Sequence, residues 1–392
     1  MNTRLAPLAV LLAALLGGCA SAPEPAAVPY EVIADAGFAP PSERVTADDV
    51  FALSPAMQAY LRSPAFTSFL REHGPVRGLI AALYTKGELR LDYDATVTRP
   101  AAGTYAARSG NCMSLVLMTA AFARALNLDI TFQSVLVDET WTRNGTLYLA
   151  STHVNLVLGK REWDVIRASD ASDSLVVDFL PPEDMTGYRT VPLPEAALVA
   201  LYLNNRAAEA LAAGRVDDAY WWARAAVLKD PRVATVYNTL GVIYTRHGNP
   251  ELAERSLRTA LQHEPGSLVA MQNLVPVLRQ LGRVGEADAL AARAAALHPE
   301  PPFYFFDQGR AAADRGDWQR ARDLFARETR RAPWYHEFHF WLAVASYQLG
   351  DTRAARAELE RAFDTSTSTE ARNRYAAKLN HLRAGAHGRQ GS

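Results

Sequence analysis

The chain has 392 residues, which is enough for two or three domains. Its 41 Lys and Arg residues balance 42 Asp and Glu residues, so it lacks the strongly basic character of nucleic-acid-binding proteins, and we expect no nucleic-acid partner. The sequence has no His-Glu-x-x-His, no Walker loop and no Gly-rich dinucleotide turn. We therefore expect neither a metal ion nor another cofactor.

Residues 1–18 have the features of an export signal. Arg4 gives a positive start, and Leu8 to Leu16 form an apolar run that is shorter than the about 20 residues a membrane-spanning helix needs. The run ends in Leu16-Gly17-Gly18-Cys19, and the segment from Ala22 to Pro29 is rich in Pro and Ala. This pattern predicts a cleaved leader followed by a stalk. An ordinary secretory signal that happens to contain a cysteine is the alternative.

The Leu16 to Cys19 segment resembles the lipobox of bacterial lipoproteins. The resemblance implies that a signal peptidase cuts before Cys19, that Cys19 then carries lipid chains such as palmitate, and that residues 19–45 are a lipidated linker. Ala20, where an Asp would stand in lipoproteins kept at the inner membrane, implies an outer-membrane protein that faces the periplasm. More than one lipid chain holds a protein firmly to a bilayer.

The segment from residue 46 onward contains predicted helix starts and one cysteine, Cys112. Thr46-Ala47-Asp48-Asp49 and Ser54-Pro55 both have the form of helix starts. Gly110-Asn111 predicts a turn, and the apolar stretch from Met113 to Leu126 predicts a buried helix with Cys112 at its N-terminus. There the helix dipole favours a thiolate and free N–H groups can bind an oxyanion. With Cys19 lipidated, Cys112 has no disulfide partner; it is either a used thiol or an inert core cysteine.

Four strand-like segments follow, at 130–137, 147–158, 163–166 and 174–179. The second contains His153 and the fourth contains Asp178, so a cysteine, a histidine and an aspartate occur in the order that nucleophilic acyl transfer can use. Asp164 is an alternative to Asp178. Asn155 is either a hydrogen-bonding neighbour of the site or a solvent-facing strand residue. Asn144-Gly145-Thr146 is either a hairpin turn or a glycosylation acceptor.

The stretch from about 90 to 182 resembles the transglutaminase-like core of the papain-like cysteine hydrolases. Arg108-x-Gly110-Asn111-Cys112 before an apolar helix, then His153 and Asp178 in successive strands, carry the resemblance. It implies an α+β core over 46–195, with Cys112 as nucleophile, His153 as base and Asp178 as orienting acid. An aromatic residue usually follows the histidine, whereas Val154 stands here, and the calcium ligands of the animal enzymes are absent from the sequence. Tyr105 is our candidate second oxyanion donor.

The C-terminal half repeats every 34 residues. The unit 234–267 resembles the tetratricopeptide (TPR) consensus, which predicts five repeats from about 200 to 369, a capping helix near 370–384 and a tail at 385–392. We expect residues 196–384 to form an all-α solenoid and a fragment 196–392 to fold alone, because such repeats fold from neighbour contacts. The repeating positions are prolines at 231, 265, 299 and 333 and alanines at 219, 253, 287, 321 and 355; a second alanine series, at 226, 260, 294 and 362, is broken by Glu328.

Solenoids of this kind bind a protein or peptide along their concave face. Asparagines there can hold an extended backbone, and arginines can meet a carboxylate. The alternative for each such residue is an ordinary solvated helix position. The groove candidates are Asn204, Asn238, Arg246, Gln272, Arg279 and Arg310, together with Phe306, Phe340 and Tyr347.

These patterns together predict a lipid-anchored envelope protein. Its core would be a thiol-dependent amide hydrolase or an acyl transferase, with water the favoured acceptor, and its repeats would bind a protein partner or substrate. The competing interpretation is a non-catalytic TPR lipoprotein that scaffolds an envelope assembly.

Overall fold

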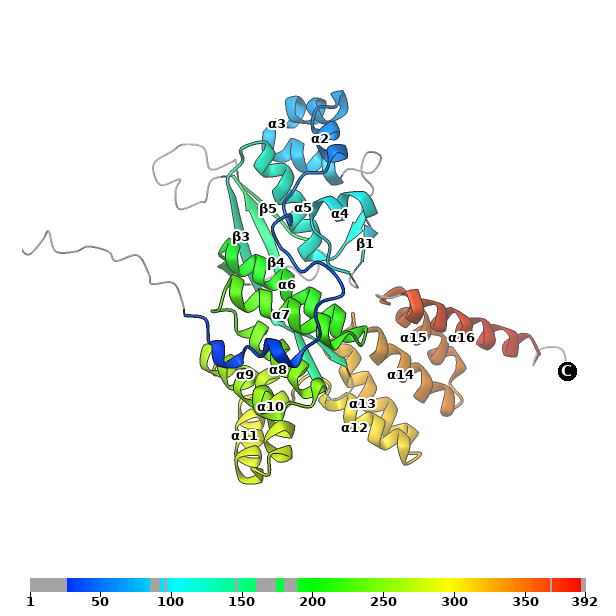
Figure 1. Cartoon of the computed structure of the whole chain (residues 1–392). Coiled ribbons are helices and arrows are strands. Elements are labelled where there is room, and N and C mark those ends of the chain that lie inside the picture. The colour runs from blue at the N-terminus through cyan, green and yellow to red at the C-terminus, as the bar shows by residue number, and fades with distance from the viewer. Residues whose placement is uncertain are drawn as a thin grey trace, which may run out of the picture.

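The computed structural model describes residues 27–84, 92–94, 97–144, 147–159, 174–179, 189–366 and 369–388. In these residues an N-terminal segment, 27–53, which we call the strap, is followed by a core of helices with a small antiparallel sheet and then by an array of helices (Figure 1). The predicted leader and Cys19 lie outside the described residues, as do the predicted strand 163–166 and Asp164. No described helix combines the length and the apolar character needed to cross a bilayer.

Short helices open the core. Ser54 caps the first of them by accepting a hydrogen bond from the Met57 N–H, so the helix start predicted there is confirmed. The start predicted at Thr46 is wrong: Thr46 Oγ1 bonds Asp48, and this side-chain pairing closes a turn in place of a helix. The helices are α2 (Pro55–Leu61), α3 (Pro64–Tyr84), α4 (Ala101–Ala107) and α5 (Cys112–Ala125).

A four-stranded antiparallel sheet packs against α5. Its order is β5-β4-β3-β6, formed by Leu175–Val177, Leu147–Leu158, Ile130–Asn144 and Arg189–Pro192. A two-residue parallel ladder joins β1 (Asp92–Tyr93) to β2 (Ser109–Gly110). The predicted strand at 130–137 continues to Asn144, because the β3–β4 hairpin extends past the core and reaches the helices of the array (Figure 1).

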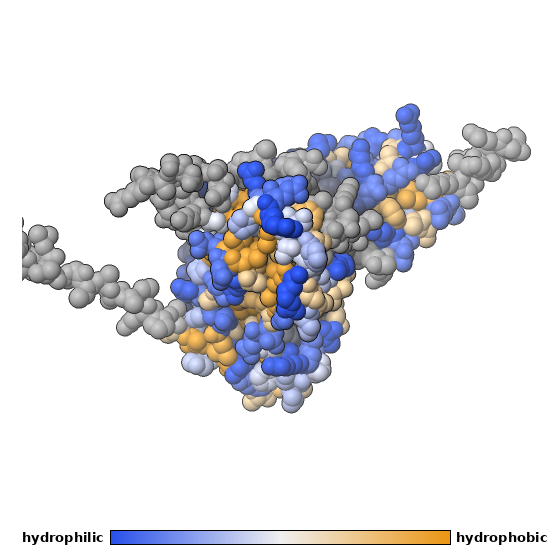
Figure 2. All heavy atoms as spheres, turned by 90° about the horizontal axis from the view of Figure 1, so that it is seen from above, coloured by the Kyte–Doolittle hydropathy of each residue, from blue (hydrophilic) through white to orange (hydrophobic). Residues whose placement is uncertain are grey.

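Apolar residues gather on the end of the molecule that carries α2 and α3, where polar residues surround them (Figure 2). Partly buried side chains of α3, among them Leu70, Val76 and Ile80, pack there onto a core cluster that also contains most of α5. That cluster continues through α6 and α7 into the array. The core and the first repeats therefore share one hydrophobic interior.

The array consists of five helix pairs and a final helix, as the 34-residue period predicts. Gly241 explains one consensus position: a Cβ there would lie 2.5 Å from Leu257 Cγ, so only glycine allows the two helices of that pair to approach. The helices are α6 (Glu195–Ala212), α7 (Val216–Lys229), α8 (Ala234–His247), α9 (Pro250–His263), α10 (Leu268–Gln280), α11 (Val284–Leu297), α12 (Tyr304–Asp314), α13 (Trp318–Arg331), α14 (His336–Gln348), α15 (Thr352–Asp364) and α16 (Thr369–Gly388).

Glu328, which interrupts the alanine series, has a structural reason. Its carboxylate is buried and accepts hydrogen bonds from the N–H groups of Phe305 (2.9 Å) and Phe306 (3.2 Å) at the start of α12. The preceding Phe303 has a left-handed backbone (φ 67°). A negative side chain satisfies the free N–H groups of a helix start, so Glu328 fixes the beginning of the fourth repeat.

The strap lies across the first repeats. The ring of Phe38 stacks on Tyr220 at 3.9 Å between centroids, and Tyr220 Oη donates to Asp35 Oδ1 at 2.5 Å. Tyr244 Oη donates to the Val32 carbonyl at 2.7 Å. The described part of the segment 19–45, which the lipoprotein resemblance implies to be a linker, is thus docked on α7 and α8.

Candidate functional site

Local sequence places Cys112 at the first position of α5. Asn111 is the N-cap: its Oδ1 accepts from the Ser114 N–H at 3.0 Å and from Ser114 Oγ at 2.9 Å. Gly110 is required beside it, since a Cβ there would lie 2.5 Å from Ser114 Cβ. Cys112 is partly exposed, whereas most of α5 behind it is buried. A thiol at the N-terminus of a helix is favoured as the thiolate.

Neighbouring strands bring His153 and Asp178 together. Strand β4 carries His153, and Asp178 directly follows β5, which pairs with β4 through Leu156 and Val177. His153 Nε2 lies 2.7 Å from Asp178 Oδ1, and the two side chains are 7% and 3% exposed. Asn155, two residues further along the same face of β4, donates to Asp178 Oδ2 at 2.8 Å. Asn155 therefore holds the carboxylate from inside the core.

The charge of His153 depends on both of its neighbours. Burial alone would lower the pKa of His153, but the hydrogen bond with Asp178 and the side-chain hydrogen bond with Cys112 outweigh it and raise the pKa to about 9. Because Nε2 faces Asp178, the Nδ1 atom is the one available to the thiol. Cys112, His153 and Asp178 thus form a continuous chain of contacts, in the order that thiol-based acyl transfer requires.

A second chain of hydrogen bonds links the array to the N-cap of α5. Glu209 of α6 accepts from the Thr98 N–H at 2.6 Å, and Thr98 Oγ1 accepts from Asn111 Nδ2 at 2.8 Å. Arg206 pairs with Glu209 at 2.7 Å and reaches Glu43 of the strap at 3.3 Å. Burial raises the pKa of Glu209, against the opposing effects of Thr98 and Arg206. The helix start that carries Cys112 is therefore supported from the repeats.

Glu209→Ala should destabilise the fold, because it leaves the Thr98 N–H without its acceptor in a partly buried place; such a loss costs about 1–3 kcal/mol. Glu209→Gln keeps a carbonyl oxygen there and should recover most of the stability. Urea denaturation of both variants measures the difference. Equal stabilities of Glu209→Ala and the wild type would show that this bond contributes nothing.

The remaining sequence candidates fall in different places. Tyr105 is buried in α4, with its ring 5.8 Å from that of Phe122, so core packing accounts for it. Phe306 is wrong as a groove residue: it is 1% exposed and packs between the fourth and fifth repeats, where Phe325 and Phe338 contact it. Of the other groove candidates, Asn204 is buried, Gln272 has a buried Oε1, Arg246 is exposed and Tyr347 is half exposed. The remaining three contact other side chains: Phe340 packs on Tyr375, Arg279 pairs with Asp288, and Arg310 stacks on Trp341.

Asn238 is the groove candidate with the most informative contacts. Its Oδ1 accepts from Asn273 Nδ2 at 2.9 Å, and both side chains bond the backbone of Tyr148 in the core hairpin. Sequence reasoning selected Gln272 and missed its neighbour Asn273. It also missed Thr98, Ser114 and Glu209.

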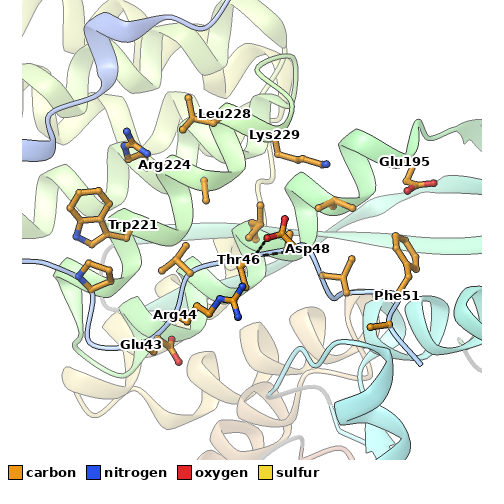
Figure 3. Close-up of a pocket in the computed structure, with 18 of the residues that line it drawn as sticks. Glu43, Arg44, Thr46, Asp48, Phe51, Glu195, Trp221, Arg224, Leu228 and Lys229 are labelled. Carbon is orange, nitrogen blue, oxygen red and sulfur yellow. Dashed lines mark hydrogen bonds between the residues drawn. The ribbon is translucent and has the colours of Figure 1, made fainter. Parts of the chain in front are cut away.

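A pocket of about 1100 Å³ lies between the strap and helices α5 to α7, away from Cys112, His153 and Asp178 (Figure 3). Arg124 lines it, pairing with Glu195 at 2.5 Å and stacking over Phe51. Charges of both signs line it, with Glu43, Arg44 and Asp48 on the strap facing Arg224 and Lys229 on α7. Cys112, His153 and Asp178 do not line this pocket. Among the described residues, no group of three or more His, Cys, Asp or Glu is placed to hold a metal ion.

A family model described as tetratricopeptide repeat matches residues 273–333 and 306–371. The C-terminal region carries tetratricopeptide repeats. Both matches lie within the helices from α10 to α16, and they agree with the consecutive helix pairs seen there. TPR units stack into an array whose concave face is open to a ligand.

Solved TPR structures are similar to this half of the chain. YrrB, described as a TPR protein with an unusual peptide-binding site, is 22% identical over 46% of this chain and 92% of its own, with a TM-score of 0.25. TTC0263 of Thermus thermophilus is 18% identical over 46% and 98%, with a TM-score of 0.32, and Pseudomonas aeruginosa pilF is 20% identical over 49% and 93%, with a TM-score of 0.30. Such low scores carry no argument about function. No curated protein matches the chain.

Proposed function

We propose that the core is a thiol-dependent amide hydrolase or acyl transferase and that the TPR array holds it and binds a protein partner. The observation that carries the catalytic part is the position of His153, with Asp178 at 2.7 Å on one side and the Cys112 thiol on the other. The repeats support the protein-binding part. Lipid anchoring through Cys19, at the outer membrane and facing the periplasm, belongs to the same proposal and rests on the lipobox resemblance.

The proposed reaction has two steps. The Cys112 thiolate attacks the acyl carbon of an amide, and the C–N bond breaks as the His153 imidazolium gives its proton to the leaving amine. His153, now neutral, then takes a proton from water, which attacks the thioester and releases the acid and the thiolate; an amine in place of water would give transamidation. The N–H groups of Cys112 and Met113 have no carbonyl partner within the helix and can bind the oxyanion.

A thioester on Cys112 is the decisive intermediate. We would incubate the protein with peptidyl amides, quench it in acid and measure the mass of the Cys112 peptide. The expected adduct is the acyl group without its amine, and it should be absent from Cys112→Ala. If wild-type protein forms no adduct and Cys112 also resists alkylation at pH 6, the catalytic proposal is wrong.

The second candidate function is a non-catalytic scaffold. The family match favours it, because that match covers the repeats and not the core. A scaffold would keep all its partners in Cys112→Ala and leave Cys112 unreactive. A hydrolase should retain its substrates longer when Cys112 is replaced, so pull-downs from envelope extract with the wild type and Cys112→Ala separate the two functions.

A further inference from the structure

The first residues of β4 pack against the TPR array of the same chain. β4 contacts α8 and α10 (Figure 1), and Tyr148 of β4 makes polar contacts there. The Tyr148 N–H donates to Asn273 Oδ1 at 3.1 Å, and the Tyr148 carbonyl accepts from Asn273 Nδ2 at 2.9 Å. A single side-chain amide thus bonds both polar groups of one residue, as a neighbouring strand would.

The two asparagines form a fixed pair. Asn273 Nδ2 also donates to Asn238 Oδ1 at 2.9 Å, and Asn238 Nδ2 reaches the Tyr148 carbonyl at 3.4 Å. With the hairpin in place, Asn273 is 1% exposed and Asn238 is 3% exposed, so both amides are buried at the contact with Tyr148. Buried amides need partners, and the strand edge at Tyr148 supplies them.

The side chain of Tyr148 also has a defined place. Its ring lies 6.2 Å from that of Phe303, and it packs on the cluster formed by residues of α10, α12 and α14. The site therefore combines an amide pair that hydrogen bonds to a peptide backbone with an apolar surface that contacts an aromatic ring. An ordinary solvated helix face would have neither.

We propose that Asn238, Asn273 and Phe303 form a binding site for an extended protein segment with an aromatic residue, and that Tyr148 of the chain's own hairpin occupies it until a partner segment replaces it. The hairpin shows the chemistry of the partner: a backbone N–H and carbonyl that bond one side-chain amide, with an aromatic side chain beside Phe303. This inference rests on the partner-binding part of the proposed function and needs no thiol chemistry.

The proposal implies communication with the core. Tyr148 and His153 belong to the same strand, five residues apart. Replacement of Tyr148 by a partner would release that end of β4 from the array. The partner would therefore act on the strand that carries the histidine, without touching the thiol.

The test uses the full-length chain and a fluorescent peptide with the sequence of residues 146–152, TLYLAST. Tyr148→Ala removes the competing ring, so the peptide should bind this variant at least about tenfold more tightly than the wild type in fluorescence anisotropy. Adding Asn273→Ala to Tyr148→Ala should abolish the gain. A control peptide, TLALAST, should bind at least about tenfold more weakly, because the ring is missing.

Hydrogen exchange at the Tyr148 amide gives an independent readout. In the wild type, saturating TLYLAST should make this amide exchange faster, and Asn273→Ala should do so without peptide. Should Asn273→Ala not fold by circular dichroism, Asn238→Ala replaces it, since it removes only the longer of the two amide bonds to the Tyr148 carbonyl and leaves those of Asn273. Equal affinity of the peptide for the wild type and Tyr148→Ala, or unchanged exchange at Tyr148, overturns the proposal. Failure of the catalytic proposal is seen separately, in the reactivity of Cys112.

Discussion

His153→Ala is expected to reduce the rate of Cys112 alkylation at pH 6 about 100-fold, because an unassisted thiol with a pKa of about 8.5 is less than about 1% ionised there. In the wild type, the His153 imidazolium lies against the thiol, and its pKa of about 9 keeps it charged at pH 6 to 8. The wild-type rate should therefore rise less steeply between pH 6 and 8 than the rate of the variant. The variant's rate should rise about tenfold per pH unit.

Iodoacetamide labelling followed by mass spectrometry measures both rates. Cys19→Ser provides the background, since it leaves Cys112 as the one remaining cysteine of the sequence. The matched control is His73→Ala, which removes an exposed histidine of α3. Parallel pH profiles for the wild type and His153→Ala would contradict a thiolate–imidazolium pair.

The same ionisation fixes the sign of a stability effect. The folded pKa of His153 is raised from 6.5 to about 9. Its charged form therefore stabilises the fold fully below pH 6.5, and this contribution is lost as the pH rises through about 9. The stability difference between the wild type and His153→Ala should shrink over that range.

Phe38→Ala is expected to lower the free energy of unfolding by roughly 3 kcal/mol, the usual cost of removing a buried Phe side chain. The ring is 7% exposed and lies between Tyr220, Tyr244 and His247. Tyr30→Ala is the matched control on the same strap, because Tyr30 is 70% exposed and its loss should cost little. Urea denaturation of the two variants decides; similar small losses would mean that the strap adds no stability.

The strap also changes what we expect of a C-terminal fragment. The repeat pattern alone suggests that residues 196–392 fold by themselves. In the structure, Tyr220 and Tyr244 are fully buried, and strap residues cover both rings. A fragment that starts at 196 would expose them, so we expect it to be less stable than one in which residues 27–53 are present.

Periodicity made the repeats predictable. A proline every 34 residues and alanines in register specify helix ends and close helix contacts, which are local properties. Cys112, His153 and Asp178 could be selected because a turn before an apolar helix and two strand patterns stand in sequence. The contact of His153 with Asp178 is a property of the β4–β5 pairing, and that of Cys112 with His153 is a property of the packing of α5 on β4; sequence patterns specify neither.

Other features could not be predicted, because they depend on contacts between residues that are far apart in the sequence. Asn273 differs from Gln272 by one helix position, or about 100° around the axis, and only the direction of the arriving hairpin decides between them. Residues 19–45 are predicted to be a linker, yet Val32 and Phe38 of this segment are buried and anchor the strap. Glu209 looks like a solvated helix residue until Thr98 is placed beside it.

The docked strap has a consequence for the order in which the chain folds. Val32 and Tyr244 are hydrogen bonded although 212 residues separate them in the sequence, and Ser42 and Asp218 are hydrogen bonded at a separation of 176 residues. The strap is synthesised before its docking surface exists, so it has to wait until α7 and α8 have formed. Closing loops of this length is entropically costly and slows folding. Strap docking should therefore be the last and slowest folding step, visible in refolding as a late change around Trp221, whose indole N–H donates to the Ala39 carbonyl.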